Sequence, residues 1–350
     1  MISSRHGSCA EPGGNGIGHI TLLCYRVKLI CADAIDRRIF ERTGGGVGKR
    51  ILVTGGTGFI GSALCAELAA AGYEVVVLSR SATGEAPEGI RRVRWDARSA
   101  DGWRNEAEGA AALINLAGDN IGEGRWTERK KRAIRQSRLE AGRAVAAAFD
   151  AVKKRPGVLV QASAIGWYGD RGDEPLDEDS RPGSGFLPSI GREWEDSTAA
   201  VESLGVRRVV LRTGVVLGRG GMLARAAVPF RLFAGGIPGN GKPWISWIHL
   251  GDVVRAIRFL VEKADARGAY NLTAPMPVRS AEFYRALGRT LRRPVWAPVP
   301  GALLRLAFGE MARELMLSGQ RVLPKHLIEA GFNFEYGELG AALEEIFSGW

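Results

Sequence analysis

Residues 51–61 read ILVTGGTGFIG, a short apolar run that leads into glycines at positions 55, 58 and 61. Spacing of this kind is typical of a strand-to-helix turn that binds a dinucleotide. Gly55 permits the tight turn, Gly58 lets the backbone approach a pyrophosphate, and Gly61 lets the helix pack closely on its strand. The free N–H groups at the start of the helix then attract the phosphates. The stretch therefore predicts a dinucleotide-binding turn.

The sequence around the turn completes a β-α-β unit. A helical pattern over residues 59–71 stops at Gly72, and residues 74–78 form an apolar run typical of a buried strand. The second strand ends in Ser79 and Arg80, where a site selective for NAD would place an acidic residue against the ribose. An arginine at this point suits a 2′-phosphate, so the sequence favours NADP(H) over NAD(H). An ordinary solvated charge is the alternative for Arg80.

Strand and helix patterns keep alternating up to residue 217. Further strands are expected over residues 93–96, 112–118, 158–163 and 208–213, and helices over residues 127–152 and 186–204. This alternation predicts an α/β fold with a doubly wound, Rossmann-like parallel sheet. We expect an NAD(P)-binding part over residues 48–217 and a smaller substrate-capping portion over residues 218–350, interleaved with the sheet. The loops after Gly118, Ser163 and Thr213 are expected to face cofactor and substrate.

Composition narrows the class of protein. No apolar stretch approaches the roughly 18 residues of a membrane span, and the first 47 residues do not resemble a signal peptide, so we expect a cytoplasmic protein without membrane contact. The 48 Lys and Arg residues exceed the 38 Asp and Glu residues but are spread along the chain, which disfavours nucleic-acid binding. No histidine or cysteine has ligand spacing, so no metal site is expected. Residues 1–47 are interpreted as a disordered extension or a wrongly assigned start.

Several segments resemble the extended branch of the short-chain dehydrogenase/reductases when taken in order: TGGTGFIG, INLAG, ASAIGWYG, LRTGVVLG and WIHLGD. Others are similar to the YfcH-type epimerase-family proteins. They are RWTERKKRAIRQSR (125–138), GKPWISWIHLGDVVRAI (241–257), YNLTAP (270–275) and GEMARELMLSGQRVLPKHLIEAGF (309–332). The similarity covers about residues 50–347 and includes a C-terminal extension of that family at about residues 300–347.

The resemblance implies a cofactor site on the glycine turn and on the loops that follow the next strands. It assigns the pyrophosphate to Gly55, Thr57, Gly58, Phe59, Ile60 and Gly61, the 2′-phosphate to Arg80, the adenine to Asp96, and the cofactor's central portion to Leu116, Ala117 and Gly118. Core packing is the alternative for Leu116 and Ala117, and turn formation for Asp96. A small-molecule substrate is implied as well, and a homodimer is a possible assembly.

The expected catalytic pair is missing. In this superfamily a Tyr acts as general acid/base, a Lys four residues later lowers its pKa, and a Ser or Thr polarises the substrate carbonyl. None of the 6 tyrosines of this chain has a lysine four positions on. The helix that should carry the pair instead contains Trp194 and Glu195. We assign Ser163 as the polarising hydroxyl and Tyr168 as a proton donor from the same loop; a turn residue and a pocket wall are the alternatives.

Further polar and aromatic side chains near the expected loops are candidate substrate contacts: Arg125, Trp126, Trp247 and His249. A packed histidine is the alternative for His249. The sequence thus predicts an NADP(H)-dependent oxidoreductase or epimerase that acts on a small polar substrate, nucleotide- or sugar-linked. The alternative is a non-catalytic NADP(H)-binding sensor or scaffold that has lost the Tyr-Lys pair.

Overall fold

The computed structural model describes residues 48–81, 87–296 and 298–348, so the predicted extension over residues 1–47 lies outside the described part. Seven parallel strands form the central sheet, in the order β11-β7-β5-β4-β1-β2-β3. They are β1 (Arg50–Thr54), β2 (Glu74–Ser79), β3 (Ile90–Arg94), β4 (Ala112–Asn115), β5 (Val158–Ala164), β7 (Arg207–Thr213) and β11 (Gly268–Leu272). The strand order reverses between β1 and β4, which confirms the doubly wound, Rossmann-like sheet.

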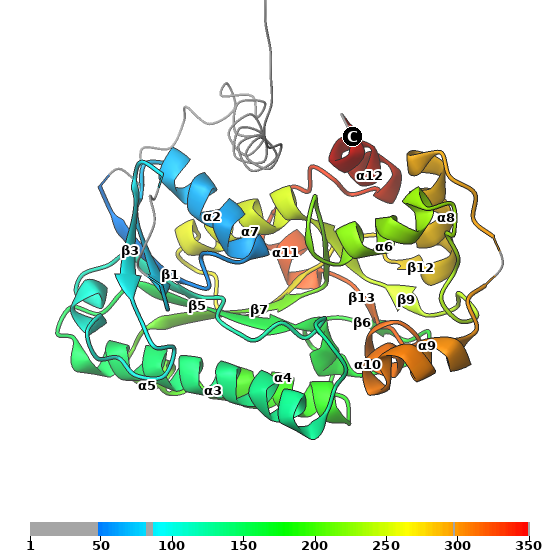
Figure 1. Ribbon diagram of the computed structural model, residues 1–350. Helices are drawn as coiled ribbons and strands as arrows, with labels where there is room; N and C mark the ends of the chain where they lie inside the picture. Colours follow the sequence, from blue (N-terminus) through cyan, green and yellow to red (C-terminus); the bar gives the residue numbers. More distant parts are fainter. Residues whose placement is uncertain (1–47, 82–86, 297, 349–350) are drawn as a thin grey trace, which may run out of the picture. The chain divides into compact units, whose positions relative to one another are not determined.

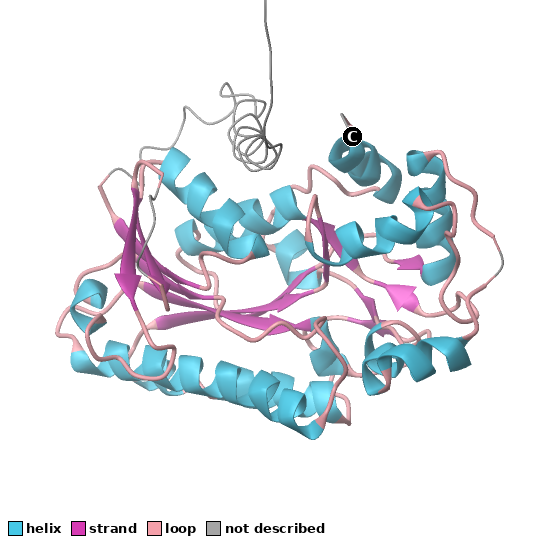
Figure 2. Cartoon of the chain, in the orientation of Figure 1, coloured by secondary structure: helices cyan, strands magenta, loops and turns pink. Residues whose placement is uncertain are grey.

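Helices cover both faces of this sheet (Figures 1 and 2). One face carries α2 (Phe59–Ala70), α7 (Leu250–Glu262) and α11 (Lys325–Glu329), and the other carries α3 (Glu128–Ala151), α4 (Phe186–Asp196) and α5 (Ala200–Ser203). Along β1, Ile51 and Val53 belong to the hydrophobic core on one face of the sheet, and Leu52 belongs to the core on the other face. Since successive side chains of a strand point to opposite faces, the continuous apolar run of β1 is what a sheet covered on both sides requires.

A smaller portion lies beyond the carboxyl ends of the strands, at the right of Figure 1. It consists of α6 (Gly221–Arg231), α8 (Ser280–Leu291), α9 (Gly301–Phe308), α10 (Glu310–Leu315) and α12 (Leu339–Phe347), with the short strands β6 (Pro175–Leu176), β8 (Val215–Leu217), β9 (Trp244–Ile245), β10 (Trp247–His249), β12 (Val278–Arg279) and β13 (Arg321–Val322). Its core includes Phe230, Phe283 and Leu343. In the described chain no helix combines the length and the apolarity that a membrane span needs.

Three of the expected elements have clearly different bounds. β4 ends at Asn115, three residues before the end of the predicted strand. β3 ends at Arg94, before the predicted strand does, because Asp96 accepts hydrogen bonds from the N–H groups of Arg98 and Ser99 and forms a turn. The helix expected over residues 186–204 is divided into α4 and α5. At the break the Ser197 hydroxyl donates to the carbonyl of Trp194 at 2.6 Å, a local bond that competes with the helical pattern.

Candidate cofactor and active site

The turn between β1 and α2 has room for glycine only. Gly55 has a φ of 67°, and a Cβ there would lie 2.7 Å from the carbonyl oxygen of Leu116. A Cβ on Gly61 would collide with the carbonyl oxygen of Gly55. Glycine supplies both the left-handed conformation and the close approach, so the physical roles predicted for these two positions match their geometry.

The first turn of α2 is open to an anion. Gly58 is the N-cap residue, and no side chain caps the helix. Thr57 and Gly58 are exposed, whereas Phe59 and Ile60 are half-buried. The N–H groups at a helix start have no partner within the helix, so they are available to a phosphate. The residues of this turn therefore fit the pyrophosphate of a dinucleotide cofactor.

The other predicted cofactor residues follow the carboxyl ends of neighbouring strands. Arg80 is exposed directly after β2, and Gly118 is exposed in the loop after β4, where Leu116 and Ala117 are half-buried. The exposed Asp96 accepts hydrogen bonds from the backbone of Ser99 and Arg98, which lower its pKa. Open α/β sheets bind ligands along this edge, but the role of each residue stays a prediction.

A chain of buried polar side chains links the ends of three strands. Thr54 Oγ1 donates to Asn115 Oδ1 at 2.7 Å, and Asn115 Nδ2 donates to Gln161 Oε1 at 2.9 Å. The N–H groups of Leu116 and Ala117 lie 3.1 and 3.2 Å from Thr54 Oγ1. This chain holds the start of the β4 loop, where the cofactor is predicted to pass.

Ser163, at the end of β5, is paired with a carboxylate. Its hydroxyl donates to Glu195 Oε1 of α4 at 2.6 Å, and only 4% of the residue is exposed. Arg212 of β7 donates through Nε and Nη2 to the two oxygens of the same carboxylate, each at 3.0 Å. Burial alone would lower the pKa of Arg212, but its bonds to Glu195 raise it, so the guanidinium stays charged. The pair is bidentate, which fixes the carboxylate toward Ser163.

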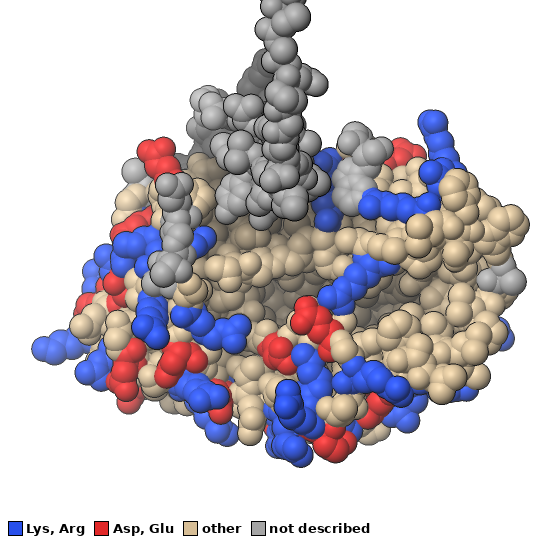
Figure 3. Space-filling model, in the orientation of Figure 1, with Lys and Arg blue, Asp and Glu red and all other residues tan. Residues whose placement is uncertain are grey.

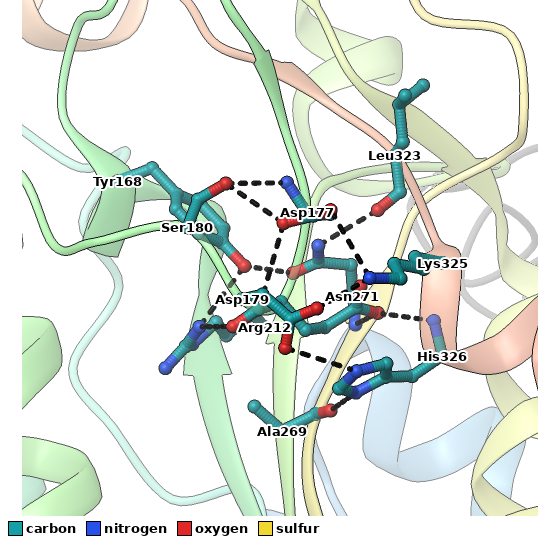
Figure 4. A network of polar contacts seen from close by, with 11 residues as sticks. Tyr168, Asp177, Asp179, Ser180, Arg212, Ala269, Asn271, Leu323, Lys325 and His326 are labelled. Atoms are coloured by element: carbon teal, nitrogen blue, oxygen red, sulfur yellow. Dashed lines mark hydrogen bonds and ion pairs between the residues drawn. The ribbon is translucent and has the colours of Figure 1, made fainter.

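Tyr168 lies in the interior, next to this pair. It is fully buried, donates its hydroxyl hydrogen to Asn271 Oδ1 at 2.8 Å, and accepts a hydrogen bond from Arg212 Nη1 at 3.1 Å (Figure 4). Burial raises the pKa of Tyr168 to about 12. The structure thus brings Tyr168 to the partners of Ser163 but gives its hydroxyl no exposed surface. Its role as a proton donor stays a prediction.

The same network attaches the C-terminal extension to the sheet (Figure 4). Asn271 of β11 donates through Nδ2 to the carbonyl of Leu323 at 2.9 Å, and Nδ1 of His326 donates to the carbonyl of Ala269 at 2.9 Å. Buried Glu178 accepts from the N–H groups of Asn271 and His326 at 2.8 and 3.3 Å. The residues that follow β13 are therefore hydrogen-bonded to β11, the edge strand of the sheet.

The candidate substrate contacts in the smaller portion are packed inside it. Trp247 is fully buried, and its Nε1 donates to the carbonyl of Met276 at 3.0 Å. His249 Nδ1 accepts from the N–H of Gly251 at 3.1 Å, so Nε2 carries the proton and donates to Glu345 at 3.0 Å. Burial lowers the pKa of His249. This histidine joins the start of α7 to α12.

The other two candidates sit at the start of α3. Trp126 is buried beside Phe186, and its Nε1 donates to the carbonyl of Ile121 at 2.8 Å. Arg125 is exposed beside Gly309. Trp126 and Trp247 belong to different cores, so the structure does not gather the four candidates in one place. Their contact with a substrate stays a prediction.

Sequence reasoning missed Arg138, which lies against the β4 loop. Its guanidinium carbon would be 3.2 Å from a Cβ on Gly118, and it lies 4.7 Å from the ring centre of Trp194. Nη1 donates to the carbonyls of Asp119 and Ile134 at 3.1 and 3.0 Å, and burial lowers the pKa of Arg138 to about 10. The motif 125–138 placed this residue on a helix but did not show which neighbour it meets.

Two further contacts connect the smaller portion to the cofactor side. Arg225 of α6 donates to the carbonyl of Gly122 and pairs with Glu123 at 3.5 Å, in the loop after β4. The Phe59 ring lies against the glycine-rich loop before α6, since a Cβ on Gly220 would be 2.9 Å from it. Figure 3 shows that this face of the molecule is hollowed between its two helical layers, with Lys and Arg side chains near the rim.

Comparisons with known proteins agree with this geometry. The model of the NAD dependent epimerase/dehydratase family matches residues 51–273, and that of the domain of unknown function DUF1731 matches residues 299–346. The epimerase family protein YfhF of Bacillus subtilis is 40% identical over 299 residues, which are 85% of this chain and 98% of YfhF.

Solved structures give the same result. The crystal structure of human epimerase family protein SDR39U1 with NADPH has a TM-score of 0.78 and 35% identity, and the match covers 86% of this chain and 100% of that one. A nucleoside-diphosphate sugar epimerase from Corynebacterium glutamicum has a TM-score of 0.69 and 33% identity, over 86% of this chain and 58% of that one. The predicted resemblance is confirmed: the chain belongs to the NAD dependent epimerase/dehydratase family and carries a C-terminal DUF1731 domain.

Proposed function

We propose that this protein is an NADP(H)-dependent oxidoreductase or epimerase that acts on a small polar substrate, nucleotide- or sugar-linked. The observation that carries the proposal is the uncapped glycine turn at the start of α2, which leaves space where a pyrophosphate binds. Two relatives support it: the SDR39U1 crystal structure contains NADPH, and the bacterial homologue is named a nucleoside-diphosphate sugar epimerase.

The preference for NADP(H) rests on Arg80. This arginine is exposed at the carboxyl end of β2 and has no ion-pair partner among the described residues. In a dinucleotide fold the end of the second strand lies beside the adenosine ribose, where NAD-selective sites carry an acidic side chain. A guanidinium at this point binds a 2′-phosphate and gives an NAD-type 2′-hydroxyl no carboxylate acceptor.

Bound NADP(H) supplies the redox chemistry of the nicotinamide ring. The protein must supply a proton path, and we assign it to Ser163 and Glu195. The Ser163 hydroxyl donates its hydrogen to the carboxylate, which leaves the lone pairs of Oγ to accept a proton from a substrate hydroxyl. A proton can pass from that hydroxyl to Ser163 Oγ while the serine proton passes to Glu195. The 2.6 Å distance is within the reach of general acid/base transfer.

Arg212 positions this pair, and Tyr168 in turn contacts Arg212. In this assignment the phenol is a buried support. The predicted alternative, with Tyr168 as the proton donor, needs a rearrangement that exposes its hydroxyl. Single variants of Glu195 and Tyr168 separate the assignments, because the first predicts that turnover depends on Glu195 and the second that it depends on Tyr168, whereas Ser163 takes part in both.

The test is a binding and turnover screen on the whole chain. NADPH and NADH are titrated first, and carbonyl compounds and nucleoside-diphosphate sugars are then offered while the nicotinamide absorbance band and the sugar products are followed. The proposal expects tighter binding of NADPH and turnover of at least one compound. A matched Gly61→Val variant, which fills the turn, should lose both.

A non-catalytic NADP(H) sensor is the second candidate function. It is favoured by the missing Tyr-Lys pair together with the burial of Tyr168. Tight NADPH binding without turnover across the whole panel would support the sensor and reject the enzyme. Failure to bind either dinucleotide would reject both.

A further inference from the structure

A second hollow lies on α8, apart from the cofactor turn. Its volume is about 440 Å³, within the range of about 300–1,000 Å³ that small-molecule sites occupy. Four of the side chains that line it are arginines, at positions 285, 289, 292 and 293, and none of the lining residues is acidic. In Figure 1, α8 lies at the right-hand side beyond α6, whereas β1 lies at the left, so this hollow belongs to the smaller portion alone.

The four arginines, here called the arginine pocket, lie at the C-terminal end of α8: Arg285 and Arg289 are on the helix, and Arg292 and Arg293 follow it. Positions 285 and 289 are four residues apart, a spacing that stacks their side chains on one helical face. In the described part of the chain none of the four has an acidic side chain within ion-pair distance. Like charges at this spacing repel each other. A polyanionic ligand would remove that repulsion.

The helix dipole explains only part of this arrangement. Cations are favoured at the C-terminal end of a helix, which accounts for Arg289 in the last turn and for Arg292 directly after it. Arg285 lies a turn earlier. Arg293 follows the helix, and its Nε is buried with no hydrogen-bond partner in the described structure. Buried donors are nearly always paired, so this Nε is one of the few exceptions in the described chain, although Nη1 of the same side chain donates to the carbonyl of Arg292 at 3.1 Å.

The end of α8 keeps an arginine where glycine is usual. The N–H of Arg293 donates to the carbonyl of Gly288 at 2.8 Å, and that of Arg292 to the carbonyl of Arg289 at 3.0 Å, as in a Schellman cap. Arg292 has a φ of 53°, a left-handed conformation that strains a residue with a side chain. Strain of this kind is found where a site holds a side chain in place.

Aromatic rings flank the arginine pocket. Arg293 lies 4.4 Å from the ring centre of Phe233, and Trp296 Nε1 donates to the Phe233 carbonyl at 2.6 Å. The two aromatic residues are 58% and 64% exposed, which is unusual for rings of this size. Exposed rings beside arginines are the combination that binds a base by stacking and its phosphates by charge.

We propose that the arginine pocket binds a free nucleotide with two or more phosphates, with the phosphates on Arg289, Arg292 and Arg293 and the base on Trp296 or Phe233. This site is separate from the cofactor turn and does not depend on the proposed reaction. A nucleotide supplies phosphate oxygens for the arginine side chains and a flat face for the exposed rings.

The experiment titrates AMP, ADP, ATP and tripolyphosphate into the whole chain saturated with NADPH, so that the cofactor turn is occupied. Affinity is expected to rise with the number of phosphates and to fall as salt increases. The double variant Arg289→Ala/Arg292→Ala should lower the affinity for ATP at least tenfold. Trp296→Ala should lower the affinity for ATP but leave the affinity for tripolyphosphate unchanged. Arg143→Ala, an exposed arginine of α3, is the control and should change neither.

Thermal unfolding checks that each variant is folded, and only variants with the unfolding temperature of the parent are compared. Equal ATP affinity in the parent and the double variant would overturn the proposal. So would a short single-stranded oligonucleotide that binds the arginine pocket more tightly than ATP, since the site would then be one for nucleic acid. If NADPH does not bind to the chain, the proposed function is rejected. The nucleotide titration is then made on the protein without NADPH and still tests the arginine pocket.

Discussion

Ser163 and Glu195 are joined by a 2.6 Å hydrogen bond between the end of β5 and α4. In the wider superfamily a hydroxyl at this strand end works with a tyrosine, but here its partner is a carboxylate held by Arg212. The serine is common to both arrangements, and a glutamate and a guanidinium accompany it here where the superfamily uses a phenol and an ammonium. Our proposed function assigns proton transfer to this serine–glutamate pair.

Ser163→Ala and Glu195→Gln should each lower kcat by about 100-fold or more, because removing a general acid/base typically costs 10²- to 10⁴-fold. NADPH affinity should stay the same, since neither side chain belongs to the glycine turn. The measurement is steady-state turnover beside a cofactor titration. Full turnover by Ser163→Ala would reject the proton path.

Tyr168→Phe is the matched comparison. Loss of the hydroxyl leaves Asn271 Oδ1 and one N–H of Arg212 without their buried partner, so we expect the free energy of unfolding to fall by about 1–3 kcal/mol. Turnover should remain within a few-fold of the parent at a temperature where the variant is folded. Denaturant unfolding and kcat are the two readouts. A collapse of kcat in a fully folded variant would restore Tyr168 as the proton donor.

The contrast between Ser163 and Tyr168 shows what could be predicted from the sequence. The sequence predicts one loop for both residues, but Ser163 belongs to strand β5, whereas Tyr168 ends the 3-10 helix η3 (Ile165–Tyr168) and is fully buried. The glycine turn was predictable because its roles depend on the backbone alone. The partners of Ser163 were not predictable, since Glu195 and Arg212 lie on other elements and meet it only through tertiary packing.

The bounds of helices and strands also show what sequence patterns cannot predict. Apolar periodicity located α3 and the strands of the sheet, because burial on a layer repeats along the chain. It missed the break between α4 and α5, which depends on a hydroxyl bond of Ser197, and it extended β3 over Asp96, which forms its own turn. Local side-chain bonds of this kind leave no periodic signal.

Arg80→Ala should lower the affinity for NADPH by about tenfold or more and leave the affinity for NADH unchanged. A hydrogen bond to a charged group contributes about 1.5–3 kcal/mol, and about 1.4 kcal/mol corresponds to tenfold in affinity. Calorimetric titration of both dinucleotides gives the ratio directly. Arg104→Ala, an exposed arginine of the 3-10 helix η2 (Arg104–Ala107), serves as the control. An unchanged NADPH affinity in Arg80→Ala would make this arginine an ordinary solvated charge.

His249 should make the protein less stable in mild acid. Burial lowers its pKa in the folded chain, although the charges of Glu345 and Asp252 oppose the shift. Its neutral ring caps α7 through Nδ1, and protonation removes that acceptor. The unfolded chain therefore binds the proton more readily than the folded chain. The contribution of His249 to the free energy of unfolding is present above its ordinary pKa of about 6.5 and is lost as the pH falls below that value.

His249→Asn keeps a capping oxygen without a titrating ring. The free energy of unfolding should therefore fall between pH 7.5 and pH 5.5 more steeply in the parent than in the variant, and parallel curves would show that other groups cause the loss.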